Sequence, residues 1–230
     1  MREIDKRRPN PRYCPFFLDI QGKRCVVVGG GPVASRKVML LLDGGADVRV
    51  VSPRLCLELG RLAAARKIDA VREEYRPAGL NDAFLAIAAT SRAEVNTRVA
   101  ADARRRKIPV NVVDAPGLSD FIVPSHFRRG DLTVAVSTSG KSPALARKIR
   151  TAFELSLGEG YEALTGLVEE VRREIKARAI CVDGDGWQQA LDVDLLIELL
   201  GQGQRAKAKS VLMKNLKRIG GKAPSKGTPR

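Results

Sequence analysis

The sequence has few of the residues that most metal and base-stacking sites use. Aromatic residues make up 4% of the 230 residues, which disfavours a surface that stacks exposed bases. The single histidine, His126, has no second histidine beside it, and no cysteine belongs to a C-x-x-C pair. This inventory argues against a dedicated zinc site. We expect a structural or surface role for His126 and a buried apolar role for Cys25, which opens a valine run.

Long apolar runs are missing as well. No run approaches the roughly 20 residues that a membrane span needs. The charged N-terminal stretch MREIDKRRPNPRYC is not followed by the apolar region of a signal peptide. We therefore expect a cytoplasmic protein with no membrane partner.

Positive charge is abundant and unevenly distributed. The formal net charge is +15, and residues 205–230 hold nine Lys or Arg and no acid. Such a segment is typical either of nucleic-acid binding or of a solubilising end, and the Gly, Pro and Ser in GGKAPSKGTPR favour the second interpretation. We expect an anionic ligand and no nucleic-acid partner.

The first half of the chain alternates apolar strands with helices. Strands are predicted at residues 24–29, 46–52, 83–90 and 108–114, and helices at 32–45, 55–67 and 92–107. Continuous apolar strands separated by helices predict a parallel sheet covered on both faces. The fold class is therefore α/β, with a doubly wound, Rossmann-like domain over residues 1–123.

The pattern then changes. One clear strand is predicted at residues 131–137, and the rest is predicted to be helical, at 142–157, 161–175, 187–200 and 204–219. Two of these helices carry an apolar stripe at helical spacing. Its members are Leu145, Ile149, Ala152 and Phe153 in the first, and Tyr161, Leu164, Val168, Val171 and Ile175 in the second.

A glycine turn joins the first strand to the first helix. The segment GGGPVA fits G-x-G-x-x-A at Gly29, Gly31 and Ala34, with Gly30 between the glycines. Glycines at this place let the backbone approach a pyrophosphate, and the free N–H groups of the helix start attract its charge. The strand–turn–helix context predicts dinucleotide binding.

The residues that would choose between NAD and NADP are ambiguous. NAD-binding domains usually carry an acid at the end of the second strand, where this chain has Ser52, Pro53 and Arg54. Serine and arginine favour a 2′-phosphate, hence NADP, although Arg54 is equally compatible with a solvated surface residue. The spacing leaves both cofactors open.

Two further segments are candidate sites. SGKSP, at Ser139 to Pro143, contains part of a P-loop, but Ala135 stands where the first glycine is required. Ser139, Gly140 and Ser142 suit a carboxylate, or Ser142 simply caps the following helix. Asp114 ends the last strand of the sheet, where ligands of open α/β folds bind, and is a candidate general base or a surface turn residue.

Four segments together resemble precorrin-2 dehydrogenase, the dehydrogenase and often chelatase part of siroheme synthase. They are FFLDIQGKRCVVVGGGPVASRK, then AAT with Asn96 following, NVVDAPGLSDFIVPS, and LTVAVSTSGKSPALARKIR. The block from Asn111 to Arg150 is the most specific, because generic dinucleotide folds lack it. The resemblance covers roughly residues 13–200.

This resemblance implies an enzyme that oxidises precorrin-2 to sirohydrochlorin and passes a hydride to NAD⁺. It implies an NAD-binding Rossmann domain at 1–123, a segment at 124–156 that forms a homodimer, a helical domain at 157–219 and a basic flexible tail at 220–230. It puts the essential aspartate at Asp114. It puts cofactor contacts at Pro32, Val33, Pro53 and Arg54, and it implies NAD because the family also lacks the acid after the second strand. Together with the glycine turn and the strand ends, the predicted cofactor contacts are Gly29, Gly30, Gly31, Pro32, Val33, Ser52, Pro53, Arg54 and Thr90. A basic cleft suits a carboxylate-rich substrate, so the candidate substrate contacts are Ser139, Gly140 and Lys141, with Arg128, Arg129 and Arg147 as further cations.

Two alternatives remain open. The first is a bifunctional enzyme that also inserts Fe²⁺ into sirohydrochlorin, which no metal-ligand cluster in the sequence predicts or excludes. The second is a non-catalytic regulatory domain that senses NAD.

Overall fold

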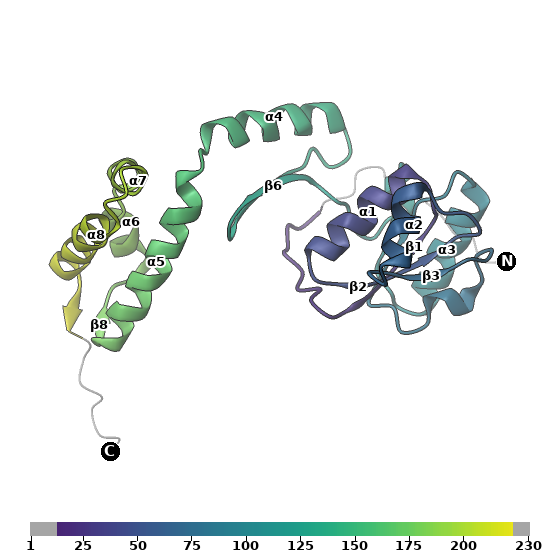
Figure 1. The fold of residues 1–230 in the computed structure, drawn as a ribbon, viewed down its shortest axis with the longest axis horizontal. Coiled ribbons are helices and arrows are strands. Elements are labelled where there is room, and N and C mark those ends of the chain that lie inside the picture. Colours follow the sequence, from purple (N-terminus) through teal and green to yellow (C-terminus); the bar gives the residue numbers. More distant parts are fainter. Residues whose placement is uncertain (1–12, 223–230) are drawn as a thin grey trace, which may run out of the picture. The chain divides into compact units, whose positions relative to one another are not determined.

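The computed structural model describes residues 13–222, which fall into two units (Figure 1). The sheet unit comprises residues up to Val123 together with Ser139–Lys141, and the helical unit comprises Pro124–Thr138 and the residues from Ser142 on. From residue 223 onward, the predicted flexible tail lies outside the described residues.

The sheet unit is built on a five-stranded parallel sheet in the order β3-β2-β1-β4-β5. Its strands are β1 (Arg24–Val28), β2 (Asp47–Val51), β3 (Asp69–Val71), β4 (Leu85–Ala88) and β5 (Val110–Val112). Its helices are α1 (Pro32–Asp43), α2 (Leu57–Ala64) and α3 (Ala93–Arg105), with 3-10 turns η1 (Pro77–Leu80) and η2 (Pro116–Leu118). The doubly wound α/β fold predicted from the sequence is confirmed.

Both faces of this sheet are buried, which explains its continuous apolar strands. Along β1, Val26 and Val28 belong to the core cluster that includes Val99 of α3, whereas Cys25 and Val27 belong to the cluster that includes Val38 of α1. Cys25 is fully buried, as expected, and burial raises the pKa of its thiol to about 11.

The strand ends are aligned at the carboxyl edge of the sheet. In the pairing register, Val28 lies opposite Val51 of β2 and Ala88 of β4, and Ala88 lies opposite Val112 of β5. The loops that follow these strands therefore leave the sheet side by side, and this edge positions the candidate site.

The helical unit begins with an antiparallel hairpin of β6 (Ser125–Arg129) and β7 (Leu132–Val136). Helix α4 (Pro143–Ser156) contacts both strands. The core of the unit is formed by α5 (Gly160–Ala177), α7 (Val193–Gly201) and α8 (Arg205–Ile219), with Leu167, Leu196 and Leu212 fully buried. The remaining elements are α6 (Gly184–Ala190), β8 (Ile180–Cys181) and β9 (Gly221–Lys222).

The structure corrects four details of the predicted elements. Strands β3, β6, β8 and β9 were not predicted, because β3, β8 and β9 have only two or three residues and β6 reads SHFRR. The single helix predicted at 187–200 is interrupted, because Asp192 caps the start of α7. In α5, Leu167 is buried in addition to the predicted stripe. In α4, Leu145 and Phe153 of the predicted stripe are about half exposed.

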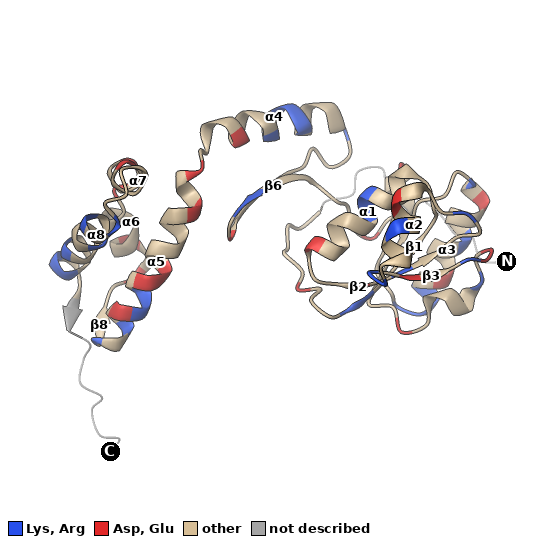
Figure 2. Cartoon of the chain, viewed as in Figure 1, with Lys and Arg blue, Asp and Glu red and all other residues tan. Residues whose placement is uncertain are grey.

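Charged side chains are spread over both units (Figure 2). On α8, Lys209 lies 2.8 Å from Glu170 and 2.9 Å from Glu174, both on α5. These hydrogen bonds lower the pKa of both carboxyls.

Within residues 13–222, no helix has both the length and the hydropathy needed to cross a membrane.

Candidate dinucleotide site

A cavity of about 680 Å³ opens at the carboxyl edge of the sheet unit. Loops that follow all five strands contribute to its wall, because the aligned strand ends bring them together. Its volume lies within the range of small-molecule sites. Its lining includes Gly29, Gly30, Gly31, Pro32, Val33, Ser52, Pro53, Arg54, Glu74, Tyr75, Thr90, Arg92 and Asp114.

The glycine turn is packed between the loops after β2 and β4. Gly29 has a φ of 134°, and a Cβ there would lie 2.4 Å from the carbonyl oxygen of Ala89. A Cβ on Gly30 would lie 1.8 Å from the carbonyl oxygen of Arg54. The Gly29 N–H donates to Val51 O at 3.0 Å, and the Gly30 carbonyl accepts from Cys56 N at 2.7 Å. Side chains are therefore excluded at both positions.

Gly31 differs from its two neighbours. It is the N-cap of α1, and a Cβ on it would have no heavy atom within 4 Å. No side chain caps α1, and its first turn contains no acid. The first N–H groups of this helix thus have neither an intrahelical nor a side-chain acceptor, and a phosphate group suits them. The residues present fit a dinucleotide pyrophosphate.

The loop after β2 forms another wall of the cavity. Ser52 is 8% exposed, and its hydroxyl donates to the carbonyl oxygen of Arg54 at 2.7 Å. The hydroxyl proton is therefore already bonded within the turn whose Arg54 carbonyl packs against Gly30. Pro53 and Arg54 are exposed beside it.

The side chain of Asn96 fixes the loop after β4 by hydrogen bonds to Thr90. Thr90 N donates to Asn96 Oδ1 at 3.2 Å, and Asn96 Nδ2 donates back to Thr90 O at 3.0 Å. The Thr90 hydroxyl lies 2.7 Å from Asn96 Oδ1 and 3.0 Å from Arg92 O. Asn96, only 9% exposed, thus fixes the shape of the cavity wall at Thr90.

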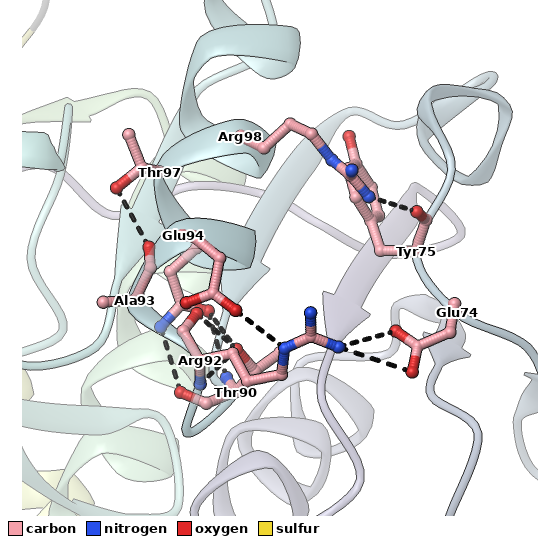
Figure 3. Close-up of polar contacts among 9 residues, drawn as sticks. Glu74, Tyr75, Thr90, Arg92, Ala93, Glu94, Thr97 and Arg98 are labelled. Carbon is pink, nitrogen blue, oxygen red and sulfur yellow. Dashed lines mark hydrogen bonds and ion pairs between the residues drawn. The ribbon is translucent and has the colours of Figure 1, made fainter.

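Sequence reasoning missed the ion pairs at the rim (Figure 3). Arg92 Nε donates to Glu94 at 2.8 Å, and Arg92 Nη1 lies 3.3 Å from Oε2 of Glu74. The hydrogen bond to Glu94 and the charge of Glu74 raise the pKa of Arg92, and the same hydrogen bond lowers the pKa of Glu94. The only sequence signal was the acidic pair Glu73-Glu74 after the unpredicted strand β3.

Tyr75 anchors this rim to the core. Its hydroxyl donates to buried Asp102 at 2.9 Å, and burial followed by this hydrogen bond raises the pKa of Tyr75. Arg98 stacks over the ring at 5.3 Å and donates to the Tyr75 carbonyl at 2.6 Å. The neighbouring Glu74 is therefore attached to a fixed piece of backbone.

Asp114 lies at the other side of the cavity, after β5. It is exposed and has a φ of 58°, a left-handed conformation that Asp tolerates better than most residues. Burial and the charge of Arg36 lower the pKa of half-buried Lys37, and the carboxylate of Asp114 opposes that shift. Asp114 is thus within electrostatic reach of a cation on α1.

The predicted substrate segment Ser139–Lys141 also belongs to the sheet unit. A Cβ on Gly140 would lie 3.5 Å from Pro116, two residues beyond Asp114. The structure therefore places this segment near the loop that carries Asp114. Ser142, in contrast, accepts from Leu145 N at 3.2 Å and caps α4, so the capping interpretation of Ser142 is confirmed.

The remaining candidates lie in the helical unit. Arg129 is 3.9 Å from Glu154, whereas Arg128 and Arg147 are exposed. His126 is exposed on β6, with Nδ1 3.3 Å from the carbonyl oxygen of Pro124. Residues 13–222 contain no group of three or more His, Cys, Asp or Glu side chains arranged to hold a metal ion.

Two family models match the chain. Residues 16–125 match the family described as "Putative NAD(P)-binding", and residues 129–154 match the one described as "Sirohaem biosynthesis protein central". The first match covers the glycine turn and Asp114, so the sheet unit binds a nicotinamide cofactor.

Individual relatives agree with these matches. A siroheme synthase of Methylobacillus flagellatus is 47% identical over 164 residues, which are 71% of this chain and 35% of that protein. Siroheme synthase 1 of Aeromonas salmonicida is 41% identical over 198 residues, 85% of this chain and 42% of that protein. The chain thus spans less than half the length of these relatives.

A solved structure covers more of the chain. The protein titled "SirC, precorrin-2 dehydrogenase" is similar with a TM-score of 0.64 and 25% identity, over 90% of this chain and 100% of that one. At 90% of the chain, the similarity extends over most of both units.

Proposed function

We propose that the chain, which is similar to siroheme synthases and to a precorrin-2 dehydrogenase, oxidises precorrin-2 to sirohydrochlorin with NAD⁺ as the hydride acceptor. One observation carries this proposal. A single cavity is lined by the glycine turn after the central strand β1, which suits a dinucleotide, and by Asp114, a carboxylate after the edge strand β5.

In this proposal the chain binds and orients the cofactor and the substrate. It also accepts the proton that the oxidation releases. The first N–H groups of α1 hold the pyrophosphate, and the Gly29–Gly30 backbone lets it approach. Bound NAD⁺ supplies the hydride acceptor. Oxidation removes one hydride and one proton from the tetrapyrrole, and Asp114 receives that proton or directs it to water.

The charge of the chain supports a carboxylate-rich substrate. The net charge is +15, and Lys141 is exposed in the segment that lies near the Asp114 loop. Positive charge around a cleft raises the local concentration of an anionic substrate. We assign Ser139, Gly140 and Lys141 to substrate binding on this basis.

The direct test is an anaerobic assay with the purified chain, precorrin-2 and either NAD⁺ or NADP⁺. The proposal predicts formation of NADH together with the sirohydrochlorin spectrum. Binding of a dinucleotide without turnover would favour a regulatory NAD-sensing domain instead. A parallel reaction with sirohydrochlorin and Fe²⁺, compared with the protein-free rate, tests for additional chelatase activity.

We also propose that residues 124–156 form a homodimer. On α4, Leu145 and Phe153 of the predicted apolar stripe are 50% and 48% exposed. An apolar stripe of this kind is typical of a surface that a second protein covers, and a second copy of the hairpin and α4 provides a matching stripe. Sedimentation equilibrium should give a dimer for the chain and a monomer for Phe153→Glu, and a monomeric unmodified chain would contradict this proposal.

A further inference from the structure

Glu74 is placed to do what the missing acid after β2 does in other dinucleotide-binding domains. The acid in those domains accepts hydrogen bonds from the adenosine ribose. Here Ser52 occupies that place, is 8% exposed, and donates its hydroxyl proton to Arg54 O at 2.7 Å. The Ser52 hydroxyl is neutral and nearly buried, so a charged acceptor for the ribose has to come from another element.

The order of the strands separates the two carboxylates that line the cavity. The pyrophosphate site follows β1, in the middle of the order β3-β2-β1-β4-β5. Glu74 follows β3, beyond β2, which is the adenosine side, and its carboxylate contacts Arg92 in the loop after β4. Asp114 follows β5, on the other side. Glu74 is the acid that lines the cavity on the adenosine side.

The contacts of Glu74 leave both of its oxygens able to accept further hydrogen bonds. A single nitrogen, Arg92 Nη1, lies 3.3 Å from Oε2 and 3.5 Å from Oε1 (Figure 3). The Glu74 side chain remains 67% exposed. Arg92 makes its shorter bond, 2.8 Å, to Glu94. Glu94 thus anchors the arginine, and the arginine holds Glu74 in place while leaving most of the lone pairs of Glu74 available.

We propose that Glu74 is the specificity-determining residue of the cofactor site: its carboxylate accepts from the adenosine ribose hydroxyls and repels a 2′-phosphate, so the chain prefers NAD(H) to NADP(H). This inference rests on the dinucleotide site of the proposed function. Arg54 acts against this preference, because its cation also lines the cavity and attracts the 2′-phosphate of NADP(H). At the rim itself, Arg92 is shared between two carboxylates, so the trio carries a net negative charge.

Titration of NADH and of NADPH, without any tetrapyrrole, tests this inference. The unmodified chain should bind NADH more tightly, and Glu74→Gln should reduce the preference for NADH over NADPH on the order of tenfold, the size of a charged hydrogen bond. Glu74→Asp, which keeps the charge, should retain most of the preference.

Glu73→Gln is the matched control. It removes the same charge from the exposed neighbour of Glu74, and Glu73 does not line the cavity. The ratio of NADH to NADPH affinity of this control variant should stay within about twofold of the ratio of the unmodified chain. Tighter NADPH binding by the unmodified chain, or an unchanged ratio in Glu74→Gln, would overturn the assignment. Since binding is measured without turnover, this result is independent of whether precorrin-2 is the substrate.

Discussion

The helices of the two units begin in different ways. Within residues 13–123, none of α1, α2 and α3 has a side chain that accepts from its first turn. In the helical unit, Ser142, Asp183 and Asp192 cap α4, α6 and α7, whereas α5 and α8 have no such cap. The helix starts at the carboxyl edge of the sheet thus have no side-chain acceptor for their first donors.

Because of this difference, a helix start contributes either to stability or to the binding of an anion. A capped helix start satisfies its own N–H groups and gains about 1 kcal/mol. An uncapped start at a cavity gives up that stability, and its donors remain available to an anion. The sheet unit compensates through the backbone, because the glycine turn is tied to β2 and to Cys56 by hydrogen bonds.

The largest effect is expected for Gly30→Ala. The new Cβ would lie 1.8 Å from the carbonyl oxygen of Arg54, which is backbone and cannot move away alone. We expect the sheet unit to lose on the order of 1–3 kcal/mol and the dinucleotide site to be disrupted. Thermal unfolding and NADH titration measure both.

Gly31→Ala is the control for this prediction. Its Cβ would meet no heavy atom within 4 Å, so the cost should stay below about 1 kcal/mol, the loss of a glycine N-cap. Equal losses for the two alanine variants would show that the tight packing at Gly30 is not what shapes the turn.

The second-largest effect is expected for Asp114→Asn. Asparagine tolerates the left-handed φ of 58° and is isosteric with Asp, so the fold and NADH affinity should be kept. Loss of a general base should reduce precorrin-2 turnover by about 100-fold or more. The measurement is the steady-state rate of NADH formation.

Asp82→Asn provides the matched control for Asp114. Asp82 is also exposed with a left-handed φ, 61°, but does not line the cavity at the carboxyl edge. Its turnover should be unchanged. Near-normal turnover in Asp114→Asn would contradict the assignment of Asp114.

The smallest effect is expected for Asp183→Ala in the helical unit. Asp183 Oδ1 accepts from Gly186 N at 2.8 Å and caps α6. Its removal should cost about 1 kcal/mol of unfolding free energy in urea. NADH affinity should not change, and a parallel loss of NADH binding would mean that capping in the helical unit also supports the cofactor site.

Local patterns in the sequence predicted the fold well. Valine-rich runs, the glycine turn and Pro32 at the start of α1 are neighbours along the chain, and the five-stranded α/β unit follows from them. Strands β3 and β6 escaped prediction because β3 is held by its pairing with β2 and β6 by its pairing with β7. Pairing between distant segments overrides weak local signals.

The candidate site was predictable only in part. Gly29, Asp114 and Thr90 stand at strand ends, and the structure brings all three to one cavity. The Arg92–Glu74 pair joins residues 18 positions apart, one of them after an unpredicted strand. The commitment of the Ser52 hydroxyl to Arg54 likewise depends on a turn geometry that the residue types do not specify.

Gly31→Asp gives the most direct test of the claim that the free start of α1 binds the dinucleotide. An aspartate at this N-cap, where a Cβ has open space, should cap the helix and raise the stability of the sheet unit by a few tenths of a kcal/mol. Its carboxylate should also occupy the donors and repel the pyrophosphate. The account predicts an equal or higher melting temperature together with NADH affinity weakened about 100-fold or more. Unchanged NADH affinity in a well-folded Gly31→Asp protein would contradict it.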